Sequence, residues 1–168
     1  ASYKDCAVLY RTNAQSRMFE ERFVSTNIPY KVIGGVNFYA RREIKDLLAY
    51  LRTIENGRDD LAVRRIINVP KRGIGLTSIN RVQEYALQKE TGFYEALLAA
   101  DLIPGIGRAL SKLESFVALI EHFKEEAGRL TPLALLTDII ETLDYENYLE
   151  EIDMEDAESR IENIEELK

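Results

Sequence analysis

The sequence predicts a mostly α-helical protein in which a small α/β segment, ordered strand, helix, strand, precedes an all-helical part. Short apolar runs lie within the first 35 residues, whereas from Arg41 onward the apolar residues recur with helical spacing. With 168 residues, of which 46% are apolar and 30% charged, the chain is long enough to bury a core. Together these observations indicate a globular domain, or parts of two.

The N-terminal segment is expected to contain two strands and one helix. The run CAVLY at residues 6–10 predicts a buried strand with a buried thiol at Cys6, and YKVIGG at residues 30–35 predicts a second strand ended by two glycines. Between them, a helix near residues 14–25 is expected to bury Met18 and the apolar residues on its face. This order is typical of one unit of a parallel α/β sheet.

The remainder of the chain predicts consecutive helices. One begins near Arg41, and the next is capped by Asp59 and is expected to bury Leu61. Thr131 followed by proline marks another helix start. Acidic residues dominate the stretch from Asp144, which is expected to be a solvated helix face. The later helices are expected near residues 59–67, 77–90, 93–100, 106–127, 132–143 and 156–168.

Charge is distributed unevenly along the chain. Residues 1–75 carry 14 Lys or Arg and 8 Asp or Glu, a net charge of +6, whereas residues 76–168 carry 8 and 21, a net charge of −13. A polyanion is therefore attracted to the first part and repelled by the last. No apolar run is long enough to span a membrane and no signal-peptide pattern is present, so a cytoplasmic protein without a membrane partner is expected.

The segment NVPKRGIGLTSINRVQEYA, residues 68–86, places two cations and a Gly-Ile-Gly turn at the start of an expected helix. Amides in the first turn of a helix lack intrahelical partners and attract anions, and glycines let a phosphate approach them closely. The turn is therefore expected to bind nucleic-acid phosphates without reading the base sequence. A plain connecting turn with solvated basic residues is the alternative. The candidate residues are Lys71, Arg72, Gly73, Ile74, Gly75 and Thr77.

A second Gly-Ile-Gly turn precedes a later helix, in the segment LIPGIGRALSKLESF at residues 102–116. Both turns resemble the hairpin turn of helix-hairpin-helix DNA-binding elements. The second has a single adjacent cation and lies in the acidic half of the chain, so it is the weaker candidate for DNA contact. Its candidate residues are Gly105, Gly107 and Arg108.

Three segments are similar, in order and spacing, to blocks of a known family. They are AVLYRTNAQSR (7–17), FYARREIKDLLAYLR (38–52) and RIINVPKRGIG (65–75). The family is the PcrA/UvrD/Rep-type superfamily 1 DNA helicases. Ala40 departs from its pattern, in which an acidic residue is frequent at that position.

The resemblance implies a domain organisation. Residues 1–40 would be part of the second RecA-like motor domain, residues 41–155 a helical domain inserted into it, and residues 156–168 the start of the return to the motor domain. The chain is thus expected to be a piece of a longer protein.

The resemblance also implies roles for matched residues. Arg11 and Asn13 would face single-stranded DNA, and the turn at residues 71–77 would contact duplex DNA. Arg41 and Lys45 would hold the two domains together or contact DNA. The parent would be a 3′ to 5′ DNA translocase that uses ATP and Mg²⁺. Its partners would be duplex DNA with a 3′ single-stranded tail and the remaining motor domains.

The phosphate-binding loop G-x-x-x-x-G-K-[ST], which such motors need for ATP, does not occur in the sequence. No catalytic residue, metal site or cofactor is therefore predicted for the chain itself. It is expected neither to hydrolyse ATP nor to unwind DNA alone.

The acidic helices of the second half leave another function open. They are also typical of a regulatory protein-interaction or autoinhibitory module that docks a basic partner or the motor's own surface. Protein capture through residues 130–168 without DNA binding would favour this alternative.

Overall fold

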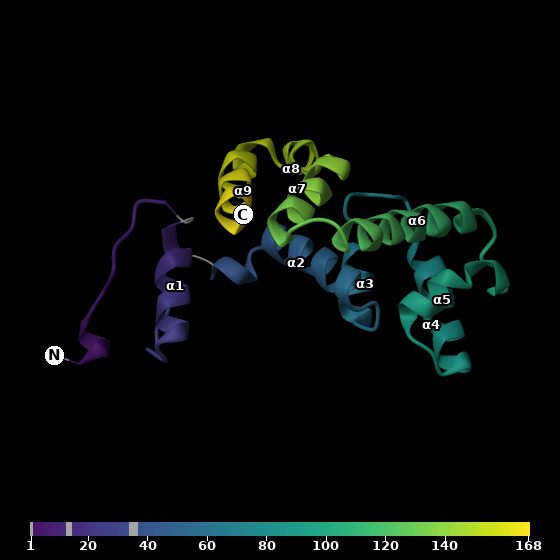
Figure 1. The fold of residues 1–168 in the computed structure, drawn as a ribbon, viewed down its shortest axis with the longest axis horizontal. Helices are drawn as coiled ribbons and strands as arrows, with labels where there is room; N and C mark the ends of the chain where they lie inside the picture. The colour runs from purple at the N-terminus through teal and green to yellow at the C-terminus, as the bar shows by residue number, and fades with distance from the viewer. Residues whose placement is uncertain (1, 13–14, 34–36) are drawn as a thin grey trace. The chain divides into compact units, whose positions relative to one another are not determined.

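A computed structural model describes residues 2–12, 15–33 and 37–168. Over these residues the chain forms α-helices joined by turns and short 3₁₀ segments, with no β-strand (Figure 1). The mostly helical class is thus confirmed. The helices are α1 (Ser16–Ser25), α2 (Arg42–Glu55), α3 (Asp60–Ile66), α4 (Leu76–Lys89), α5 (Phe93–Leu98), α6 (Leu110–Ala127), α7 (Pro132–Thr142), α8 (Tyr145–Ile152) and α9 (Met154–Leu167).

The expected strand, helix, strand order is wrong for the described part of the N-terminal segment. Residues 6–10 and 30–33 belong to no strand, while the glycines at 34 and 35 lie outside the described residues. Leu9 and Ile33 are 95% and 85% exposed, and the Cys6 thiol, expected to be buried, is exposed as well. A parallel pair of strands requires further strands to be stable, and the described residues supply none.

Helix α1 buries a polar face in place of the expected apolar one. Ser16 and Glu20 are buried, whereas Met18, expected in the core, is 64% exposed. The Glu20 carboxylate accepts hydrogen bonds from the Phe38 amide and the Tyr30 hydroxyl, both at 3.2 Å. Polar contacts therefore hold this helix to the segment that follows it.

Two compact units make up the chain. One comprises the described residues up to Lys45 together with Glu146–Lys168, and the other comprises Asp46–Tyr145. The assignment of residues 1–40, 41–155 and 156–168 to motor and inserted domains stays a prediction. No helix in the described ranges has the length and apolar character needed to cross a membrane.

Helices α3 to α7 surround the core of the unit Asp46–Tyr145. Helix α5 packs against α3, α4 and α6, and α6 packs in turn against α7. Tyr50 and Phe123 meet edge to face, with ring centroids 6.3 Å apart. The aromatic side chains fully buried in this unit are Tyr50, Phe93, Phe116, Phe123 and Tyr145.

Two expected helix starts are confirmed by their caps. The Asp59 side chain accepts a hydrogen bond from the Ala62 amide at 3.0 Å, and the Thr131 hydroxyl accepts one from the Ala134 amide at 3.3 Å. Leu61 is 81% exposed, contrary to expectation, because the face of α3 that carries Ala62 and its neighbours packs inward instead. The acidic stretch after Asp144 contains α8, which lies between the expected helix ranges 132–143 and 156–168.

Candidate nucleic-acid interface

The first Gly-Ile-Gly turn lies between α3 and α4 and is anchored by one buried side chain. Ile74 is 3% exposed, whereas the glycines on either side of it are exposed. Gly73 has a φ of +67°, in the left-handed region that favours glycine. Gly75 has an ordinary φ of −71° and is the N-cap of α4, and a Cβ placed on it would meet no atom within 4 Å. The backbone therefore requires glycine at position 73 but not at position 75.

The side-chain amide of Asn68 holds Ile74 at two points. Its Oδ1 accepts a hydrogen bond from the Ile74 N–H at 3.0 Å, and its Nδ2 donates to the Ile74 carbonyl at 2.6 Å. In a trans peptide the N–H and C=O point in opposite directions. The Gly75 N–H, which shares a peptide with the Ile74 carbonyl, is therefore directed away from Asn68.

Arg72 is turned into the protein. Its Nη2 donates to the Tyr50 hydroxyl at 2.6 Å, and its guanidinium carbon lies 5.3 Å from the centroid of the Phe116 ring. Because oxygens of the chain itself accept the hydrogen bonds of the Arg72 guanidinium, Arg72 stabilises the conformation of the turn. Its Nη1 lies 2.9–3.3 Å from the carbonyl oxygens of Ile66, Ile67, Val69 and Pro70.

Lys71 and the start of α4 form the exposed side of the turn. Within the described part of the chain, the backbone amides of Gly75, Leu76 and Thr77 donate to no protein acceptor. Thr77 is exposed and is not the N-cap, a position that Gly75 occupies. Three open amides at a helix start that follows the exposed Lys71 by only a few residues are an arrangement that can hold an anion.

The second Gly-Ile-Gly turn is also anchored by a buried isoleucine, but it leads into a 3₁₀ segment before the next α-helix begins. Ile106 is 6% exposed, and the flanking Gly105 and Gly107 have φ values of +73° and +47°. A 3₁₀ segment, Gly107–Ala109, separates the turn from α6, and Arg108 is exposed. Because both glycines have a left-handed φ, both are needed by the backbone itself.

Three side chains that sequence reasoning missed complete the two turns: Asn68, Arg81 and Lys112. The Lys112 ammonium donates to the Gly73 carbonyl at 2.9 Å, and the Arg81 guanidinium donates to the Gly105 carbonyl. Helical spacing places both cations on exposed faces of α4 and α6. Which carbonyl each one reaches depends on how these helices pack, and no local pattern specifies that.

The expected single-strand contacts lie in the N-terminal segment. Arg11 is exposed, and its backbone amide donates to the Gln15 Oε1 at 2.9 Å. The Thr12 amide donates to the same oxygen at 3.3 Å. Asn13 lies outside the described residues. A contact of Arg11 or Asn13 with DNA stays a prediction.

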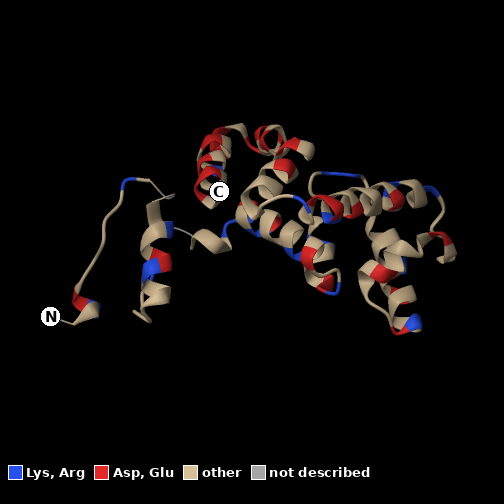
Figure 2. Cartoon of the chain, viewed as in Figure 1, with Lys and Arg blue, Asp and Glu red and all other residues tan. Residues whose placement is uncertain are grey.

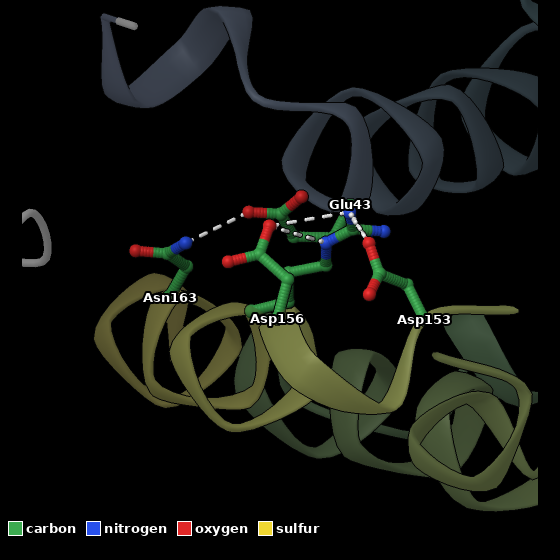
Figure 3. Close-up of polar contacts among 5 residues, drawn as sticks. Glu43, Asp153, Asp156 and Asn163 are labelled. Atoms are coloured by element: carbon green, nitrogen blue, oxygen red, sulfur yellow. Dashed lines mark hydrogen bonds and ion pairs between the residues drawn. The ribbon is translucent and has the colours of Figure 1, made fainter. Parts of the chain in front are cut away.

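Arg41 belongs to a buried polar network in the unit that ends with α9. It donates to the Ser16 hydroxyl at 3.2 Å and to the side-chain oxygen of Asn163. The Asn163 amide donates in turn to the Glu43 carboxylate at 2.8 Å (Figure 3). Burial lowers the pKa of the Arg41 guanidinium, and the charge of Glu43 opposes that shift. Lys45 is exposed.

Acidic residues gather along helices α8 and α9 (Figure 2). A groove of about 840 Å³ runs along them, and Met154 on its wall is 81% exposed. Arg160 pairs with Asp153 at 3.2 Å and Asp156 at 3.3 Å near the start of α9 (Figure 3). The carboxylates that line the groove are Glu150, Glu158, Glu162, Glu165 and Glu166.

Comparison with known proteins places these features in context. Residues 1–167 match the family described as UvrD-like helicase C-terminal domain. The ATP-dependent DNA helicase PcrA of Staphylococcus aureus is 44% identical over 165 residues, and PcrA of Staphylococcus epidermidis is 42% identical over 165 residues. Each match covers 98% of this chain and 23% of the relative, so the chain spans less than a quarter of those helicases.

Proposed function

The chain belongs to the UvrD-like helicase C-terminal domain family, and from this premise we propose that it is the duplex-contacting part of an ATP-driven DNA helicase. Relatives 42–44% identical to it are named ATP-dependent DNA helicases, which supports the proposal. In this proposal the parent moves 3′ to 5′ on DNA. ATP and Mg²⁺ are bound by motor segments that complete the parent protein.

The turn at residues 71–77 holds backbone phosphates of the duplex. The observation that carries this assignment is the row of open amides at Gly75, Leu76 and Thr77, in a turn that also contains the exposed Lys71. Arg72 stabilises the conformation of the turn through hydrogen bonds inside the protein and does not contact phosphate. Because amides and lysines carry no base information, binding is independent of sequence and weakens with salt.

The other candidate contacts are assigned as follows. Arg11 and Asn13 contact the single-stranded 3′ tail. Arg41 and Lys45 lie at the passage from the motor domain to the helical domain, where the burial of Arg41 favours a structural role and the exposure of Lys45 leaves it open to DNA. The second turn adds phosphate contacts through the residues Gly105, Gly107 and Arg108.

Gly75→Asp is expected to weaken duplex binding strongly without harming the fold. Aspartate suits the φ of −71° and the empty space at this N-cap, where its carboxylate accepts hydrogen bonds from the α4 amides. Those donors are then occupied and a phosphate is repelled, so affinity falls by at least about tenfold, the equivalent of one charge-assisted hydrogen bond. Fluorescence anisotropy with a labelled 3′-tailed duplex at low salt measures the loss, and urea unfolding measures stability.

Thr131→Asp is the matched control for this change. It adds the same charge at the N-cap of another helix, α7, and keeps a good cap. It is expected to leave duplex affinity near that of the unchanged protein. Equal affinities for Gly75→Asp and Thr131→Asp would contradict the assignment of the turn.

The regulatory alternative is supported by the acidic groove along α8 and α9. In that case a basic amphipathic helix of a partner would place apolar side chains against Met154 and cations against the groove's carboxylates. A lysine-rich amphipathic peptide would then bind, and Glu158→Gln with Glu162→Gln would weaken it severalfold. If the peptide does not bind at low salt while the duplex does, the alternative fails.

A further inference from the structure

The two Gly-Ile-Gly turns are connected by a reciprocal pair of hydrogen bonds. Lys112, on the helix that follows the second turn, donates to the Gly73 carbonyl in the first turn at 2.9 Å. Arg81, on the helix that follows the first turn, donates to the Gly105 carbonyl in the second. Each helix therefore carries a cation for the other helix's turn.

The accepting carbonyls occupy equivalent places. Gly73 and Gly105 are the first glycine of their turns, and both have a left-handed φ, at +67° and +73°. Each precedes a buried isoleucine that anchors its turn in the same core. A Cβ on Gly73 would lie 2.9 Å from the Lys112 Nζ, and one on Gly105 would lie 3.2 Å from the Arg81 Cζ. Both cations thus pack directly against a glycine, in space that the side chain of a larger residue at that position would occupy.

Lys112 and Asn68 fix two successive peptide planes of the first turn. The peptide that joins Gly73 to Ile74 is held by Lys112 at its carbonyl and by Asn68 at its N–H. The next peptide is held by Asn68 at its carbonyl, which directs the Gly75 N–H away from Asn68. The orientation of the open amides therefore depends on both partners.

We propose that Lys112 and Arg81 are reciprocal positioning residues that lock the two turns into one duplex-binding unit. This inference rests on the proposed phosphate contact of the first turn. Because Lys112 and Arg81 are engaged by carbonyls, they act on affinity through the geometry of the turns and not through contact with phosphate. The two hydrogen bonds, from Lys112 and from Arg81, depend on the same packing of α4, α5 and α6. Loss of either hydrogen bond therefore makes both turns less rigid.

The salt dependence of duplex binding separates positioning from direct contact. A lysine that touches phosphate releases counterions, so Lys71→Met lowers the slope of log affinity against log salt by about 0.9. Lys112→Met lowers affinity by about threefold to tenfold, the worth of one hydrogen bond, and leaves the slope unchanged. Lys112→Arg keeps a donor and restores most of the affinity. Lys89→Met, at the far end of α4, removes the same charge and leaves affinity unchanged.

A double variant tests whether the hydrogen bonds of Lys112 and Arg81 are coupled. Arg81→Met combined with Lys112→Met is expected to lose less affinity than the product of the single losses, because either change already releases the unit. In nuclear magnetic resonance spectra without DNA, Lys112→Met shifts the amide signals of Ile74 and Gly75, whereas Lys89→Met does not.

Failure of this inference is distinct from failure of the proposed function. If the unchanged protein does not bind duplex, or if Lys71→Met has no effect, the proposed function falls. If Lys71→Met weakens binding but Lys112→Met behaves like Lys89→Met, the positioning role is overturned. It is overturned equally if Lys112→Met lowers the salt slope as much as Lys71→Met does, or if the double variant loses the full product.

Discussion

Arg72→Met is expected to destabilise the unit Asp46–Tyr145 by about 3 kcal/mol, because a charged donor is removed from acceptors that fold around it. The Tyr50 hydroxyl and the carbonyls of Ile66, Ile67, Val69 and Pro70 lose their shared donor, and the packing on Phe116 changes. Methionine keeps the length of the aliphatic stem, so the loss reports on the guanidinium. Urea unfolding followed by circular dichroism measures the change.

Lys71→Met is the matched control for this prediction. The two cations are adjacent in sequence and the charge removed is the same, but Lys71 is exposed. Its replacement is expected to change stability by less than about 0.5 kcal/mol, as surface substitutions usually do. Arg72→Lys should fall between the two, because an ammonium lacks the planar fork that serves several oxygens. Wild-type stability for Arg72→Met would contradict the structural role of this residue.

The contrast between these neighbours shows what sequence can specify. Most helices and two caps follow from local patterns such as Asp59 and Thr131-Pro132, which act over three or four residues. The turn itself followed from its glycines and the buried Ile74. That Arg72 points inward and Lys71 outward depends on Tyr50 and Phe116, which lie far away in sequence and arrive only through packing.

The N-terminal strands failed for a related reason. The short apolar run at residues 6–10 indicates that a segment is suited to a sheet, but a strand forms only where partners exist. Among the described residues no such partner is present, and Leu9 is 95% exposed. The side chains that complete the turns, Asn68 in the segment after α3 and Arg81 and Lys112 on exposed helix faces, escaped prediction because a polar residue carries no signal of the backbone group that it meets.

Asn163→Leu is expected to loosen α9 by about 2–4 kcal/mol, because it leaves buried polar groups with fewer partners. Asn163 is 4% exposed and lies between the Arg41 guanidinium and the Glu43 carboxylate, which is also 4% exposed. The side-chain amide of Asn163, a neutral group on α9, thus joins the charged groups of Arg41 and Glu43. Leucine has a similar size, so the effect reports on hydrogen bonding and not on a cavity.

An asparagine suits this place because its amide both accepts and donates. Asn163→Asp keeps an acceptor for Arg41 but at neutral pH cannot donate to Glu43 and repels it, so this change is expected to destabilise as well. Glu162→Gln, at the exposed neighbouring position, serves as the control and should leave α9 intact. Amide hydrogen exchange along Met154–Leu167 measures the opening of the helix. If exchange there is as slow in Asn163→Leu as in Glu162→Gln, the amide bridge does not hold α9 in place.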